Sequence, residues 1–86
     1  MYELQHTGTA GVKFLRTELS AARAFLDIAE TSSGNDTLER SLRNAEMALS
    51  AIHQVLACGG IDPLQAEEIR AAARTISGLL TRLATR

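Results

Sequence analysis

Aromatic residues, proline and cysteine are scarce in this sequence of 86 residues. Aromatics make up 3% of it and consist of Tyr2, Phe14 and Phe25, and Pro63 is the single proline. Strands and barrels favour aromatic and β-branched residues, whereas alanine and leucine, which supply most of the apolar content here, favour helices. Because 45% of the residues are apolar, the chain can bury a core, and disorder is not expected. We therefore expect one all-α domain over residues 1–86.

The chain also lacks a net charge of one sign and a long apolar run. Nine basic residues stand against ten acidic ones, which leaves no chain-wide basic field for nucleic acid or anionic lipid. No apolar run approaches the roughly 18 residues of a membrane span, and the first residues do not have the pattern of a signal peptide. These features predict a cytoplasmic protein that does not enter a membrane.

Cys58 is the only cysteine. Neither an intrachain disulfide nor a cysteine-rich metal site is therefore expected. It stands at the predicted C-terminal end of a helix, where the dipole disfavours a thiolate. We expect its side chain to be a buried or half-buried apolar group.

Apolar residues recur at alternating intervals of three and four positions in three segments of the chain. This spacing places one apolar stripe along each of three helices. The predicted helices cover residues 9–31, 36–58 and 63–85, and short connections between them favour an antiparallel three-helix bundle. Residues 1–8 precede the first stripe and are expected to fray, unless Tyr2 and Leu4 pack back on the bundle.

Turn-forming residues separate these segments. Asp36, with Glu39 three residues later, has the spacing of a capping box at the start of the second helix. Gly59 predicts the end of that helix, since glycine takes the left-handed conformation without penalty. Asp62 followed by Pro63 predicts a capped start of the third helix, with proline at its first position.

His53 is the residue with the clearest potential for chemistry. It lies on the second predicted helix near Glu46 and Ser50, beside the apolar stripe. Histidine phosphotransfer domains carry a lysine and a glycine shortly after their histidine, and neither follows His53 in place here. A boundary histidine without a role is favoured, and a signalling bundle with a phosphorylatable His53 is the alternative. We expect no enzyme activity and no cofactor. We also expect no metal site, because no set of ligand residues has metal-binding spacing.

The third predicted helix is locally basic. After Glu68 it carries four arginines and no acid, namely Arg70, Arg74, Arg82 and Arg86. These residues spiral around the outer face, and no aromatic residue lies between them for stacking on bases. A solvated face is the favoured interpretation, and weak nucleic-acid binding through these arginines is a further alternative.

The first predicted helix is apolar over more than one stripe. Phe14, Ala21, Phe25 and Ile28 form a ridge beside the stripe. The combined apolar arc spans about 160°, against about 100° for a one-sided helix. Phe14 and Ile28 either form the edge of the core or line a surface for a partner helix or a second copy. Met47 falls on the polar side of the second helix, where a lone exposed methionine is common. We expect a non-catalytic protein–protein interaction module.

The segment FLDIAETSS at residues 25–33, followed by RNAEMA at residues 43–48, resembles a group of small uncharacterised bacterial proteins. Their F-L-x-[IL]-A-x-T-S segment also precedes an R-N-A-x-x-A helix. The layout is similar in turn to MIT-like (microtubule-interacting-and-trafficking) and tetratricopeptide-like bundles, and it covers most of the chain. The resemblance implies grooves between helices that bind partner helices or extended peptides. The sequence contains no tryptophan, so that position of a tetratricopeptide repeat is missing, and no binding residues carry over.

Overall fold

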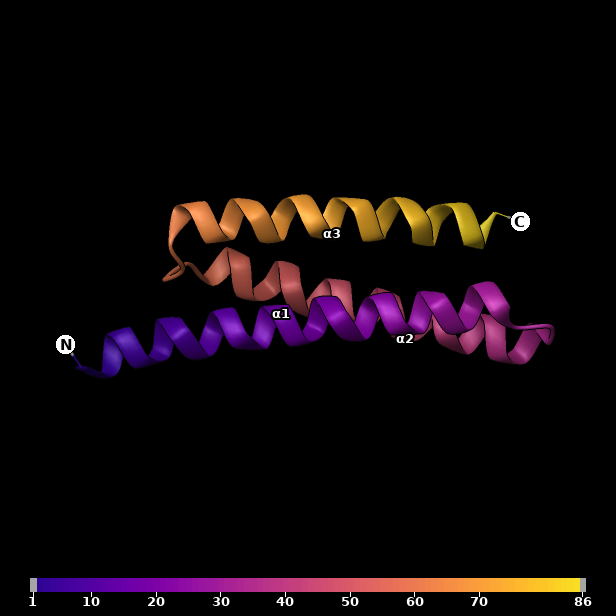
Figure 1. The fold of residues 1–86 in the computed structure, drawn as a ribbon, viewed down its shortest axis with the longest axis horizontal. Coiled ribbons are helices and arrows are strands. Elements are labelled where there is room, and N and C mark those ends of the chain that lie inside the picture. Colours follow the sequence, from indigo (N-terminus) through magenta and orange to yellow (C-terminus); the bar gives the residue numbers. More distant parts are fainter. Residues whose placement is uncertain (1, 86) are drawn as a thin grey trace.

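The computed structural model describes the backbone of residues 2–85 and the side chains of residues 11–85. The described residues form three helices and no strand: α1 (Tyr2–Thr31), α2 (Asn35–Cys58) and α3 (Pro63–Ala84). Consecutive helices are antiparallel, and α3 lies along the pair formed by α1 and α2 (Figure 1). The molecule is 50 Å long and 18 by 16 Å across. The predicted all-α three-helix bundle is confirmed.

Helix α1 begins earlier than the apolar spacing indicated. It starts at Tyr2, whereas the prediction placed its start at residue 9. No proline interrupts residues 2–9, so the backbone continues the helix beyond the apolar stripe. Figure 1 shows these first turns extending past the connection between α2 and α3. The side chains of Tyr2 and Leu4 lie outside the described residues, and fraying of residues 1–8 stays a prediction.

The start of α2 differs from the predicted capping box at Asp36. The N-cap is Gly34, one residue before Asn35, and no side chain among the described residues caps this end. The Ser32 hydroxyl shapes the turn instead, donating to the Gly34 carbonyl oxygen at 3.0 Å and accepting from the Gly34 N–H at 3.3 Å. Asp36 lies within the first turn, where its charge faces the positive end of the helix dipole. The prediction of Asp36 as the cap is therefore wrong.

The connection between α2 and α3 is built as predicted. Gly59 and Gly60 have φ angles of 80° and 82°, a region that favours glycine. The Asp62 carboxylate accepts hydrogen bonds from the backbone N–H groups of Leu64 at 3.1 Å and Gln65 at 3.3 Å. Proline occupies the first turn of α3. These local signals fix where α2 ends and α3 begins.

An alanine-rich seam joins α1 to α2. Ala22 and Ala29 of α1 and Ala45 and Ala48 of α2 are buried. Small side chains allow two helix axes to approach closely. Accordingly α1 and α2 contact each other more extensively than either contacts α3.

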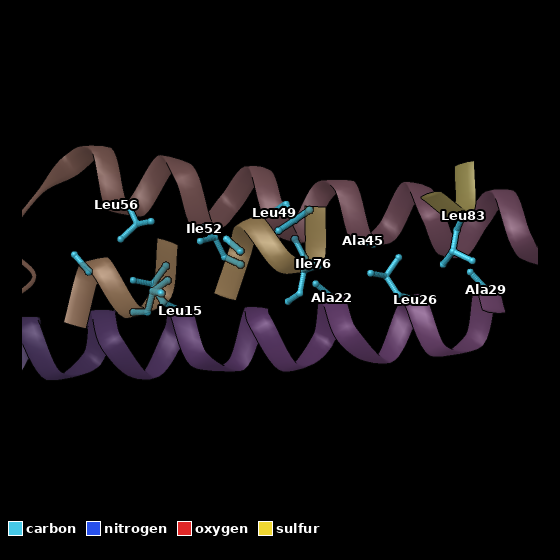
Figure 2. Packing of buried hydrophobic residues seen from close by; sticks show 14 residues of the cluster. Leu15, Ala22, Leu26, Ala29, Ala45, Leu49, Ile52, Leu56, Ile76 and Leu83 are labelled. Carbon is cyan, nitrogen blue, oxygen red and sulfur yellow. The ribbon is translucent and has the colours of Figure 1, made fainter. Parts of the chain in front are cut away.

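Larger side chains fill the space among the three helices. Leu15, Ile52 and Ile69 are the largest fully buried side chains, one from each helix. Figure 2 shows Ile76 of α3 beside Leu49 of α2 and Ala22 of α1, and Leu83 of α3 near Ala29 of α1. The core therefore holds all three helices in one unit.

Candidate interaction surface

Four large apolar side chains are exposed among the described residues. Their exposed fractions are 42% for Phe14, 47% for Ile28, 65% for Met47 and 76% for Leu64. Met47 of α2 lines a hollow with Phe25 of α1, and Phe14 and Ile28 lie on the same face of α1 as Phe25 by their spacing. Leu64 lies apart, in the first turn of α3. Apolar side chains gathered on one side of a molecule mark an interaction site more often than scattered ones do.

Helix α1 contributes a row of side chains beside its buried stripe. Phe14, Glu18, Ala21, Phe25 and Ile28 are spaced by 4, 3, 4 and 3 positions, which keeps them on one line along the helix. The three middle residues of this row are half-buried, and the two ends are exposed. Phe25 also packs against the core.

Helix α2 contributes the opposite wall. Its residues Asn44, Met47, Ala48 and Ala51 line a shallow hollow of about 370 Å³ together with Glu18 and Phe25 of α1. Val55, one turn beyond Ala51, is partly buried against the core. We use the name "α1–α2 face" for the surface formed by Phe14, Glu18, Ala21, Phe25 and Ile28 of α1 with Asn44, Met47, Ala51 and Val55 of α2.

Helix α3 covers the other side of the pair. The hollow between α2 and α3, of about 570 Å³, is lined by Leu49, Ser50 and His53 of α2 with Leu80 of α3. These α2 residues lie on the flank opposite to the one that carries Asn44, Met47 and Ala51. The α1–α2 face is therefore the side of the bundle that no helix among the described residues covers.

The three sequence-predicted site residues lie on one face of α1, with Phe14 and Ile28 about 20 Å apart at the two ends of the row. Phe14, Phe25 and Ile28 lie in one row, and Phe14 and Ile28 are exposed instead of closing the core. Sequence reasoning missed the contribution of Met47, which it placed on the polar side of α2. The missed signal is the spacing of 3 and 4 positions from Asn44 through Met47 to Ala51, which marks a second line on α2.

His53 lies on the opposite side of α2, with Glu46 and Ser50 in the hollow shared with α3. Its side chain is exposed, as a boundary histidine or a phosphorylatable one would be. A phosphotransfer role stays a prediction.

Two of the helix-three arginines are paired. Glu67 forms ion pairs with Arg70 at 3.5 Å and with Arg74 at 3.9 Å. Both pairs are exposed, so they add little stability, but they offset positive charge that a nucleic acid would need. Arg86 lies outside the described residues, and nucleic-acid binding stays a prediction.

Cys58 is exposed, which corrects the expectation of a buried or half-buried side chain. It is the last residue of α2, and the chain turns away at Gly59 and Gly60 directly after it. Leu56, two residues earlier, is buried, and the helical rotation between the two positions directs the Cys58 side chain away from the core.

Within the part of the chain that the structure describes, none of the helices is both long and apolar enough to cross a membrane. The same residues bring together no group of three His, Cys, Asp or Glu side chains that could hold a metal ion. No protein-family model matches the chain, and comparisons with curated proteins and with solved structures gave no match.

Proposed function

We propose that this protein is a non-catalytic helical interaction module, and that its α1–α2 face packs against a further helical layer. The observation that carries the proposal is the position of Phe14, Ile28 and Met47. They are three of the four large apolar side chains exposed among the described residues. Met47 lines a hollow with Phe25, whose face of α1 also carries Phe14 and Ile28.

The shape of this face suits a helical partner. Two antiparallel helices leave a groove between them, and an apolar row on each wall is the arrangement into which an amphipathic helix packs. Phe14 and Ile28 are each about half exposed, so their further burial contributes on the order of 1 kcal/mol apiece. We place this module in the cytoplasm, because its single cysteine leaves no intrachain disulfide of the kind that stabilises small secreted domains.

Affinity capture tests the proposal. The immobilised wild-type chain and a Phe14→Ser/Ile28→Ser variant are exposed to a lysate of the cells that produce the protein, and the retained proteins are identified. We expect the wild type to retain proteins that the double variant does not, since two polar hydroxyls replace the apolar ends of the face. Circular dichroism confirms that both chains are folded.

Leu64→Ser is the matched control, because Leu64 is more exposed than either residue and lies off the face. It should retain the same proteins as the wild type. Identical retention by the wild type and the double variant would refute the proposal.

A further inference from the structure

We propose that the α1–α2 face is occupied by a second copy of the same chain, related to the first by a two-fold axis. The axis lies in the plane of the face, runs from Ala21 of α1 to Met47 of α2, and is perpendicular to the helices. This inference rests on the proposed function and names the partner of the same surface. In this arrangement α1 packs over the partner's α1 and α2 over the partner's α2, each antiparallel to its counterpart. A two-fold interface requires that the face be complementary to itself.

The row on α1 has this symmetry. Phe14 and Ile28 each lie seven residues, or about 10 Å, from Ala21. A two-fold axis at Ala21 therefore places Phe14 on the partner's Ile28 and the small Ala21 on its own counterpart. The large side chains meet at both ends of the interface, and the helices can approach at its centre.

The wall on α2 has the same centre. The hollow is lined by Glu18 and Phe25 from α1 and by residues from Asn44 to Ala51 from α2, so Ala21 and Met47 lie at about the same level along the bundle. The axis places Met47 next to the partner's Met47. A flexible thioether side chain can fill the space that the small alanine at the centre leaves open.

The polar groups of the hollow are complementary across the same axis. Glu18 and Asn44 both line the hollow, on opposite helices and on opposite sides of its centre. The two-fold axis brings each Glu18 to the level of the partner's Asn44. The amide N–H of Asn44 can then donate to the carboxylate of Glu18, which gives both groups a partner as water leaves the interface.

The area of the face is sufficient for a weak dimer. Residues 11–31 of α1 run beside α2 over about 30 Å, and two packed helices are about 18 Å wide, which gives about 540 Å² per copy. Two copies together bury about 1,100 Å², close to the lower limit of about 1,000 Å² for a specific interface. We therefore expect association that depends on protein concentration in the micromolar range.

Charge favours this axis over one that runs parallel to the helices. A parallel axis would gather Arg40 and Arg43 of both copies at one end of the interface. The perpendicular axis places the two Arg40 residues about 21 Å apart, since each is seven residues from Met47. That separation exceeds the Debye length of about 8 Å at physiological salt, so repulsion between them is screened.

Sedimentation equilibrium from about 10 µM to 1 mM protein tests whether a second copy binds. We expect the mass of the wild type to rise from the 9.2 kDa of one chain towards twice that value. Met47→Glu should remain at the mass of one chain, because it would bury two carboxylates against each other, and its exposed position lets the variant fold. Leu64→Ser, the control off the face, should associate as the wild type does. A wild type that stays at one chain mass, or a dimer that survives Met47→Glu, would overturn the proposal.

The single cysteine allows the axis to be tested without a mutation in the face. Cys58 is eleven residues, or about 16 Å, from Met47, so the perpendicular axis places the two Cys58 residues about 33 Å apart. A nitroxide attached to the exposed Cys58 thiol reports this distance by double electron–electron resonance. A distribution centred near that value supports the proposal, and one well below 20 Å, as a parallel axis would produce, contradicts it.

The two proposals fail in different ways. A chain that stays monomeric in sedimentation, yet retains other proteins in a manner that depends on Phe14 and Ile28, would overturn the second copy as occupant and leave the interaction module standing. A wild type that dimerises, together with a Met47→Glu variant that stays monomeric, supports both proposals.

Discussion

At the scale of single residues, side-chain size decides what each position of α1 and α2 does. Alanines at Ala22, Ala29, Ala45 and Ala48 are buried where the two helices meet, and Leu15 and Ile52 fill the space shared with α3. Ile28 carries the same apolar character on the open flank, where nearly half of it is exposed. Isoleucine therefore belongs to the core at Ile52 and to the surface at Ile28.

The contrast between two isoleucines tests this assignment. Ile52→Ala should lower the free energy of unfolding by about 2–5 kcal/mol, because Ile52 is 0% exposed and its removal leaves a cavity. Ile28→Ala should cost about 1 kcal/mol or less, since much of its side chain already contacts water. Urea denaturation at low micromolar protein measures both. Equal losses would show that Ile28 belongs to the core.

Substitution by alanine should change the free energy of unfolding in opposite directions at two glycines. Gly59→Ala should destabilise the fold by about 1–2 kcal/mol, because its φ of 80° is unfavourable for residues with a Cβ atom. Gly78→Ala should stabilise it by about 0.5–1 kcal/mol, because Gly78 lies inside α3 and an added Cβ would meet no atom within 4 Å. Thermal unfolding of the two variants gives both signs, and a stabilising effect at Gly59 would contradict the positive φ angle at this helix end.

At the scale of secondary-structure elements, local signals predicted some helix ends and not others. The start of α3 was predictable because Asp62 and Pro63 act within their own turn. The start of α2 was not, because Ser32 organises the preceding turn by bonding to Gly34, and that pair carries no strong sequence pattern. The start of α1 was missed because its helical backbone begins at Tyr2, seven residues before the start that the apolar spacing predicted.

The two aspartates near helix starts separate a real cap from an apparent one. Asp62→Ala should cost about 0.5–2 kcal/mol, since it removes the acceptor of two backbone N–H groups. Asp36→Ala should cost less than about 0.5 kcal/mol, because Asp36 contributes only an exposed charge near the helix dipole. Chemical denaturation of the two variants under the same conditions measures both free energies of unfolding. A larger loss for Asp36→Ala than for Asp62→Ala would show that Asp36 caps α2 after all.

At the scale of the whole molecule, the arrangement of α3 decides which flank of α1 and α2 stays open. The sequence predicts a wide apolar arc on α1 and places Phe14, Phe25 and Ile28 within it. The spacing along one helix does not tell which side of the arc its neighbours cover, because the third helix of a bundle can pack on either side of the first two. Met47 was assigned to the polar side of α2 because Arg40, Arg43 and Gln54 share that side, and the spacing could not show that Met47 lies beside Phe25 of α1.

A dilution series followed by ¹⁵N nuclear magnetic resonance tests the central claim, association through the α1–α2 face, most directly. Between about 20 µM and 1 mM protein, we expect concentration-dependent shift changes to gather at Phe14, Ala21, Ile28 and Met47, with little change at His53 on the flank covered by α3. Shifts that do not depend on concentration, or that change mainly around His53 and Leu80, would contradict it.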